Sequence, residues 1–156
     1  MNATDEFAKR IARAMQAVPD LVAEEAVEYF RRRFTEKAFD GRPWRPVSPH
    51  YHPRRGTLMV RSGELLNSIR VASVNPRRVV IAAGNSKVPY ARVHNEGFTG
   101  SVTVRPHSRR KKGQVQQVRA HSRRMNVPRR QFLGRSAELE NILKREVENL
   151  FKSVLS

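Results

Sequence analysis

Apolar residues near both ends of the chain recur at three- and four-residue steps, which is the spacing of one face of an α-helix. In the N-terminal part this spacing runs from Val22 through Phe30 to Ala38, with charged residues on the other faces. Pro19 lies near the start of that run, where its missing backbone N–H costs little. We therefore expect a short helix over Asp5–Met15 and a longer second helix that begins near Pro19.

The C-terminal segment carries a continuous apolar stripe at the same spacing, from Leu139 to Leu155. Ser136 precedes the stripe and is a favourable N-cap, because its hydroxyl can accept a hydrogen bond from a free N–H of the first turn. Glu138 and Glu140 then lie in the first turn, where the helix dipole favours negative charge. The pattern predicts a long helix that begins just after Ser136.

The middle of the chain alternates between apolar and polar residues, which is typical of β-strands. Ser68–Val74 alternates in this way, and Arg78–Gly84 reads as a strand that is apolar on both faces. The turn-forming pair Asn75-Pro76 separates the two runs, and together they predict an antiparallel hairpin. Further along, Val88–Glu96 has the pattern of a short helix, and Gly97 is a suitable residue to end it.

A second strand pair is expected in the most basic part of the chain. Ser101–Arg105 alternates as a strand, and Val115–Ala120 is a candidate partner across the loop Pro106–Gly113. That loop contains Arg109-Arg110-Lys111-Lys112, which cannot be buried and is expected to project. The order helix, helix, strands, helix predicts one α+β domain over residues 1–156, with a small antiparallel sheet packed by long N- and C-terminal helices and a projecting basic β-hairpin or loop.

The positive charge of the chain is concentrated in two segments that have no acidic residues. The net charge is +17, from 31 Lys and Arg against 14 Asp and Glu. Gly41–Gly63 holds five arginines, and Ser101–Gln131 holds ten Lys or Arg and forms a basic arm within the domain. Such a surface attracts nucleic acid, an acidic protein surface or anionic lipid, or it is simply solvated. The candidate contact residues are Arg105, Arg109, Arg110, Lys111, Lys112, Arg119, Arg123 and Arg124.

The sequence lacks the features of a sequence-specific reader of nucleic acid. It contains no helix-turn-helix pair, no zinc finger and no aromatic stacking platform. Any contact with DNA would therefore go through the phosphates and be non-specific. A basic DNA-binding protein of this kind is the alternative function that the composition leaves open.

Patterns typical of catalytic and metal sites are also missing. Most acidic residues lie on the two amphipathic ends, and the remaining three, Asp40, Glu64 and Glu96, are scattered. The pair His50-Tyr51-His52 has no neighbouring third ligand for a metal, and no phosphate-binding glycine loop or nucleophile elbow occurs. We expect no enzyme activity and no cofactor.

Features of secreted and membrane proteins are absent as well. The chain has no cysteine, which rules out disulfides and thiolate metal sites. Met1–Lys9 lacks the apolar region of a signal peptide, and no apolar run approaches the roughly 20 residues of a membrane span. We expect no association with a membrane.

Four short motifs occur in order along the chain. The first has a glycine that permits a tight turn and the only tryptophan, and the second leads from a turn into the first predicted strand. The third places an aromatic residue and a histidine one helical turn apart, and so on one face, and the fourth leads into the final helix. The motifs are Phe39-x-Gly41-x-x-Trp44 followed by Pro46, Ser62-Gly63-x-Leu65-Leu66-x-Ser68-Ile69, Tyr90-Ala91-x-x-His94-x-x-Gly97 and Pro128-Arg129-Arg130-x-Phe132-Leu133-Gly134.

In this order and spacing, the chain resembles the phage virion morphogenesis family, which includes tail-completion proteins of Mu-like and P2-like phages. It is more distantly similar to the neck proteins of long-tailed phages. The resemblance runs from about residue 30 to residue 150. It implies a structural protein that is present in the host cytoplasm during assembly and then in the virion. There it would complete the tail or join tail to head as a ring of subunits that contact tail and neck proteins.

The resemblance implies structural roles, and no catalytic ones, for the motif residues. Large apolar and aromatic residues become core anchors at the helix–sheet junctions, the glycines permit turns, and His94 becomes a hydrogen-bonded core or junction residue. The segment from residue 101 to 126 is longer and more basic than the family needs, so no role is carried over to it. The motif residues concerned are Gly41, Trp44, Leu65, Ser68, Ile69, Tyr90, His94, Gly97, Phe132, Leu133 and Gly134.

Overall fold

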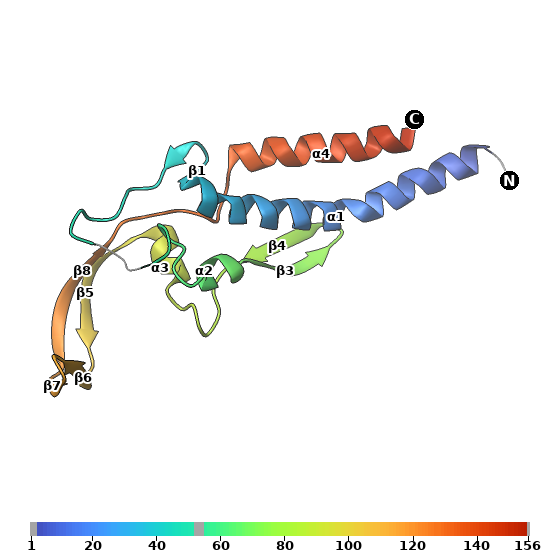
Figure 1. Cartoon of the computed structure of the whole chain (residues 1–156). Coiled ribbons are helices and arrows are strands. Elements are labelled where there is room, and N and C mark those ends of the chain that lie inside the picture. The colour runs from blue at the N-terminus through green and yellow to red at the C-terminus, as the bar shows by residue number, and fades with distance from the viewer. Residues whose placement is uncertain (1–2, 52–54, 156) are drawn as a thin grey trace.

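The computed structural model describes residues 3–51 and 55–155 and has the α+β class expected from the sequence. Its two long helices, α1 (Ala3–Glu36) and α4 (Ala137–Leu155), lie side by side and run in opposite directions (Figure 1). Four short elements lie on the other side of α1 from α4 (Figure 1). They are α2 (Glu64–Asn67), β3 (Arg70–Asn75), β4 (Arg78–Ala82) and α3 (Ala91–Glu96).

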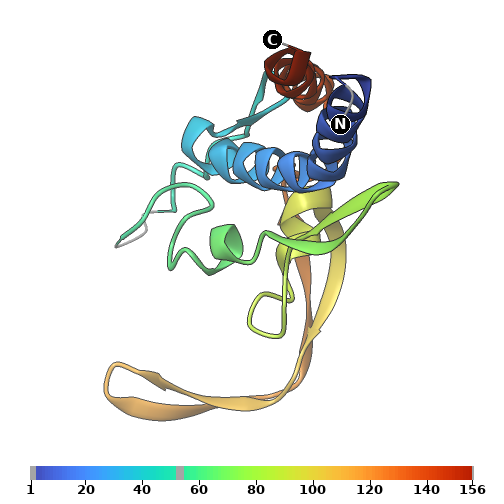
Figure 2. The ribbon, with the colours of Figure 1, turned by 90° about the vertical axis from the view of Figure 1, so that its right-hand side faces the viewer.

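The N-terminal region is one continuous helix, so the prediction of two helices is wrong. Pro19 lies inside α1 and removes one intrahelical hydrogen bond. Ala14 and Ala23 are both buried, so the helix is packed against the fold on either side of the proline and continues through it. The helix changes direction along its length (Figures 1 and 2), which is the usual effect of an interior proline.

The predicted hairpin in the middle of the chain is confirmed. β3 pairs with β4 in antiparallel register, with a bulge between Val71 and Ser73. The predicted short helix before Gly97 is confirmed as well, by α3. A tighter hairpin, β1 (Ala38–Phe39) with β2 (Arg42–Pro43), follows α1 directly and returns the chain toward the end of that helix.

A long antiparallel arm extends away from the helices (Figure 1). Its first ribbon pairs β5 (Phe98–Val104) with β8 (His121–Val127), and its second pairs β6 (His107–Lys111) with β7 (Gln114–Val118). The arm bends sharply between the two ribbons (Figure 2). The two ribbons span residues 98–127, and from here on the name basic arm refers to these residues, in place of the predicted 101–131.

The strand pairing predicted for this region is wrong. Sequence alternation places Val115–Ala120 opposite Ser101–Arg105, whereas β5 pairs with β8 and most of the expected loop forms β6. The reason is the turn between β6 and β7, where Lys112 and Gly113 have φ values of 50° and 80°. Positive φ at two successive residues is the geometry of a two-residue hairpin turn, and such a turn fixes the register of the strands on either side.

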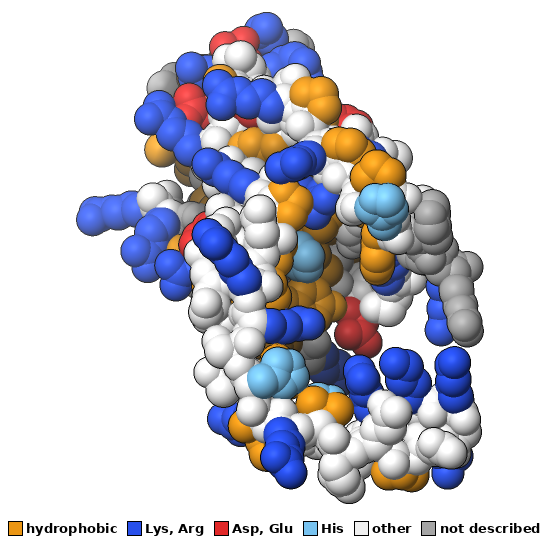
Figure 3. All heavy atoms as spheres, turned by 90° about the vertical axis from the view of Figure 1, so that its left-hand side faces the viewer, with side chains coloured by type: hydrophobic (Ala, Val, Ile, Leu, Met, Phe, Trp, Pro, Cys, Tyr) orange, Lys and Arg blue, Asp and Glu red, His pale blue; other side chains and the backbone are white. Residues whose placement is uncertain are grey.

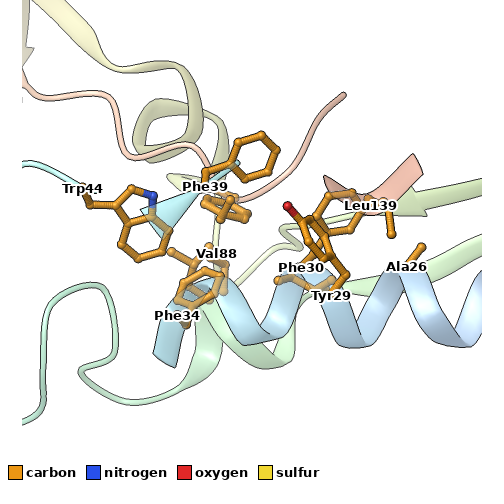
Figure 4. Packing of buried hydrophobic residues seen from close by; sticks show 12 residues of the cluster. Ala26, Tyr29, Phe30, Phe34, Phe39, Trp44, Val88 and Leu139 are labelled. Atoms are coloured by element: carbon orange, nitrogen blue, oxygen red, sulfur yellow. The ribbon is translucent and has the colours of Figure 1, made fainter. Parts of the chain in front are cut away.

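The hydrophobic core lies where the C-terminal half of α1 meets the motif segments (Figure 4). Phe34 lies at the centre of an aromatic cluster, with ring centroids 5.4 Å from Trp44 and 5.1 Å from Phe132. Leu65 and Ile69 are buried in the same cluster. Residues from motifs that are far apart in the sequence therefore share one core.

Tyr90 is the exception among the predicted core anchors. Its side chain is 40% exposed, and its ring lies edge-on to His94 with centroids 5.7 Å apart. The prediction fails because Val88 and Ala91, three residues apart, fill the core at the start of α3. With those two side chains turned inward, Tyr90 faces outward.

A polar cluster joins the start of α4 to the turn after α1. The Leu139 N–H donates to Ser136 Oγ at 3.1 Å, so the predicted N-cap is confirmed. The Ser136 hydroxyl donates to Asp40 Oδ1 at 2.8 Å, and that oxygen also accepts the Glu138 N–H at 3.0 Å. The Glu138 N–H and the Ser136 hydroxyl together lower the pKa of Asp40. Asp40 thus acts as a second cap of α4.

Arg33 is buried between the two long helices and is only 2% exposed. Its guanidinium lies over the Tyr29 ring, 4.0 Å from the centroid, and pairs with Glu138 at 3.0 Å and Glu36 at 3.1 Å. A buried charge is tolerated when it is paired in this way. The Arg33 contacts therefore fix one end of α4 against α1.

Candidate docking site

The first and fourth motifs are joined by hydrogen bonds as well as by the shared core. Trp44 Nε1–H donates to the Gln131 carbonyl at 2.6 Å. Arg130 is 7% exposed and donates to the carbonyls of Arg45 at 2.8 Å and Pro46 at 3.1 Å. Hydrogen bonds from a charged donor are stronger than neutral ones, so Arg130 holds the loop that follows Trp44.

Asn95 joins the third motif to the fourth. Its Oδ1 accepts the N–H groups of Phe132 at 2.9 Å and Leu133 at 3.0 Å, and its Nδ2 donates to the Leu133 carbonyl at 3.1 Å. Sequence reasoning missed Asn95, which occupies an unassigned position between His94 and Gly97 of the motif. The one indication in the sequence was the side-chain amide of Asn95, which can accept from an N–H and donate to a C=O of a neighbouring segment.

Ser68 and the motif glycines shape the turns around this junction. Ser68 Oγ donates to a carbonyl of α2 at 2.7 Å and accepts an N–H just beyond β4 at 2.9 Å. Gly41, Gly97 and Gly134 have φ values of 74°, 80° and 145°. At Gly97 a side chain would also come within 3.0 Å of the Arg129 backbone nitrogen, so this turn needs glycine.

All four motif segments also line one surface cleft of about 1020 Å3, which we name the motif cleft. Arg45 comes from the first segment, Glu64 from the second, Tyr90 and His94 from the third, and Arg130 from the fourth. Figure 3 shows a hollow on this side of the molecule, with hydrophobic side chains in it and Lys and Arg side chains along parts of its margin.

His94 presents an unsatisfied polar atom beside the motif cleft. Its Nδ1 is buried and has no hydrogen-bond partner among the residues that the structure describes, so the expectation of a hydrogen-bonded residue is wrong for this atom. Burial and the positive charge of Arg130 lower the pKa of His94, which favours the neutral imidazole. A buried polar atom without a partner costs free energy.

The basic arm presents positive charge with no acidic counterpart. All eight candidate contact cations are exposed, and no Asp or Glu occurs between Gly97 and Ala137. Along β5, the half-buried side chains of Phe98, Val102 and Val104 alternate with exposed threonine and serine residues. The first ribbon therefore has one apolar and one polar face, and the second carries Arg and Lys at its tip.

The comparisons with known proteins identify the family. The model of the phage virion morphogenesis family matches residues 1–152 of the chain. This chain belongs to the phage virion morphogenesis family. The resemblance drawn from the four motifs is thereby confirmed, whereas no curated protein and no solved structure matches the chain. Membership supports a structural role in phage assembly, as a virion component that interacts with other phage structural proteins.

The three acidic residues outside the amphipathic ends, Asp40, Glu64 and Glu96, do not come together. Glu96 pairs with Arg92 at 2.9 Å and Asp40 caps α4, so only Glu64 shares the motif cleft with His94. Within residues 3–51 and 55–155, no three His, Asp or Glu side chains are grouped as metal ligands. His52, half of the predicted His-x-His pair, lies outside the described residues. None of the described helices combines the length and the apolar character needed to cross a membrane.

Proposed function

We propose that this protein completes the phage tail, or joins the tail to the head, by docking to tail and neck proteins and without catalysing a reaction. Its family supports a role in assembly, and its exposed surface supports docking. The accessible surface is 11817 Å2, whereas a compact monomer of 17.9 kDa is expected to expose about 8,000 Å2. This excess surface is the observation that carries the proposal, because a subunit seated among neighbours can bury it.

The basic arm is the proposed contact element. Each of its ribbons has only two strands, and a two-stranded hairpin is marginally stable on its own. Its free strand edges can pair with a neighbouring chain, and its exposed cations can face an acidic protein surface. Both kinds of contact become available in the host cytoplasm during assembly and are then kept in the virion.

Copies of the protein are proposed to form a ring at the end of the tail or at the neck. A ring closes when one patch of a subunit docks on a different patch of the next subunit. The net charge of +17 opposes association of free copies. Native mass spectrometry of the purified protein should therefore show a monomer or a weak oligomer, and a tight dimer that resists salt would contradict the proposal.

Removal of the gene from its phage tests the assembly role. If the protein joins tails to heads, electron microscopy should show filled heads and tails of normal length that remain separate. If it completes the tail instead, the tails should be of aberrant length. Addition of the purified protein to the defective lysate should restore infectious particles in either case. Normal numbers of infectious particles without the gene would overturn the proposal.

Non-specific contact between the basic arm and DNA is a second candidate function, favoured by the eight exposed cations. Each phosphate contact makes the affinity fall with salt by a log–log slope of about −0.9. Fluorescence anisotropy with a labelled duplex over a salt series measures this slope. Sub-micromolar affinity at physiological salt would favour DNA binding as the main function, whereas weak binding that moderate salt abolishes favours docking.

A further inference from the structure

We propose that the motif cleft binds an extended peptide segment of a partner virion protein, with alternating apolar and acidic side chains. The inference rests on the proposed docking function and names the partner chemistry of a second contact site, which lies where the basic arm joins the body. Three features of the described residues carry it: an apolar floor, a basic rim and a free strand edge.

The floor of the motif cleft is apolar. Leu58 and Met59 are partly buried there against the hydrophobic core, and Tyr90 and Val127 also line it. Its volume of about 1020 Å3 lies at the upper end of the ~300–1,000 Å3 range of ligand sites, so it can hold several side chains. An occupant must therefore supply apolar groups.

The rim of the motif cleft is basic. Arg45, Arg61 and Arg130 line it, and Glu64 is the one acidic residue in its described lining. Burial, and then the positive charge of Arg45, lower the pKa of Arg130, so these two guanidinium groups repel each other. Arg61 is held toward its own loop by donating to two carbonyls, at 2.9 and 3.2 Å. A negatively charged occupant would relieve the repulsion at this rim.

A free strand edge indicates that the occupant is extended. Asn126 and Val127 of β8 line the motif cleft, and β8 pairs only with β5 in the described chain. The other edge of β8 therefore carries backbone N–H and C=O groups that can bind an added strand. In an added strand alternate side chains point to opposite sides, so apolar ones can enter the cleft while acidic ones meet the rim.

A second copy of this chain does not fit these requirements. Its acidic residues lie mostly on α1 and α4, which are helices, and its own extended arm carries only positive charge. The occupant is therefore a segment of a different, acidic protein.

The test uses short fluorescein-labelled peptides and the full-length protein, with binding followed by fluorescence anisotropy. The main probe alternates valine and glutamate. Matched peptides replace glutamate by lysine, replace valine by serine, or carry methyl groups on alternate backbone nitrogens. Each matched peptide loses one of the three contacts and should bind about tenfold more weakly or worse. Equal binding of any of the three, or displacement of the main probe from the cleft by duplex DNA, would overturn the proposal.

Paired charge variants locate the site. Arg45→Glu combined with Arg61→Glu should weaken binding of the valine–glutamate peptide at least about tenfold. The matched control is Arg77→Glu combined with Arg78→Glu, which changes the net charge equally at the exposed turn of β3 and β4. The control should stay within about twofold of the wild type. Equal losses in both variants would mean that net charge alone governs binding, which would contradict a site at the cleft.

Failure of this inference can be told apart from failure of the assembly role. If no peptide binds but deletion of the gene still blocks completion of particles, the docking function stands and the cleft proposal falls. If the peptide binds and the deletion has no effect on particles, the docking function falls. The two experiments therefore have independent outcomes.

Discussion

The body of the protein and its basic arm are held in shape by different means. In the body, buried Phe34, Trp44 and Phe132 share one core, and Asn95 and Arg130 bond segments that are distant in the sequence. In the arm, each ribbon has two strands and nearly every side chain of β6, β7 and β8 is exposed. The body thus has a hydrophobic core of its own, whereas the arm has none, and under the proposed docking function a partner would add to the stability of the arm.

This difference explains where the four motifs lie. Every one of the four motifs belongs to the body, where a core position or a turn fixes the residue type. The arm is defined by one tight turn and by its charge, which many sequences can satisfy. Similarity in the four motifs therefore indicates a shared fold. It does not identify what the arm contacts, which must be found by experiment.

The largest effect is expected in the body, from Trp44→Ala. Trp44 is buried, packs on Phe34 and donates to the Gln131 carbonyl, so its loss leaves a cavity and a freed backbone acceptor. The free energy of unfolding should fall by about 3–5 kcal/mol. Urea unfolding followed by circular dichroism measures this change.

The control for that variant lies on the arm. Val115 is 63% exposed on β7, so Val115→Ala should change the free energy of unfolding by less than about 0.5 kcal/mol. If both variants lost equal stability, the contrast between body and arm would be wrong. If Trp44→Ala lost none, Trp44 would not be part of the core.

A smaller loss is expected from Ser136→Ala at the start of α4. Its hydroxyl caps the helix and donates to Asp40, so its removal should lower the free energy of unfolding by about 1 kcal/mol. Ser122→Ala removes the same group from an exposed position of β8 and should have no measurable effect. Thermal melts of the two variants compare them directly, and equal melting temperatures would contradict the capping role.

Features with a local physical cause could be predicted from the sequence. The apolar stripe and the cap at Ser136 define α4, and the alternation around Asn75-Pro76 defines the β3–β4 hairpin, because each depends only on neighbouring residues. The four motifs allowed the family to be recognised. They also contain Trp44, Leu65, Ile69 and Phe132, which are all buried.

Features that depend on distant residues could not be predicted. Pro19 looks like a helix start, but packing on both sides carries the helix through it. The register of the arm depends on a turn at Lys112 that no hydrophobic alternation marks. Tyr90 faces outward because Val88 fills the core, and the role of Asn95 depends on a segment far along the chain.

The pH dependence of stability tests the burial of His94 in the body of the protein. Burial and the charge of Arg130 lower the pKa of His94 in the folded protein, whereas its unfolded value is about 6.5. Below about pH 6.5 the unfolded chain takes up a proton that the folded protein resists. His94 should therefore reduce stability as pH falls below this value, until the folded pKa is reached.

Urea unfolding at a series of pH values measures this contribution. His94→Phe should be less sensitive to acid than the wild type between neutral pH and pH ~5, because it removes the group that the unfolded chain protonates. A wild-type profile in His94→Phe would show that His94 is not buried in solution.

The smallest effect on stability is expected from the tip of the arm, although its effect on assembly should be large. Arg109, Arg110, Lys111 and Lys112 are exposed and have no acidic residue nearby in the sequence, so changing all four to glutamine should alter the free energy of unfolding by no more than about 0.5 kcal/mol. The same variant should fail to restore infectious particles in a lysate that lacks the protein.

A variant with the same change in net charge shows whether position matters. Its four substitutions lie on exposed parts of α1 and of the β3–β4 turn: Arg10→Gln, Arg13→Gln, Arg77→Gln and Arg78→Gln. This variant should restore particles, because it leaves the arm intact. If both variants restored particles equally, the arm would be a solvated surface. If both failed equally, total charge would act in place of a local contact, since long-range attraction depends on net charge and is screened by salt.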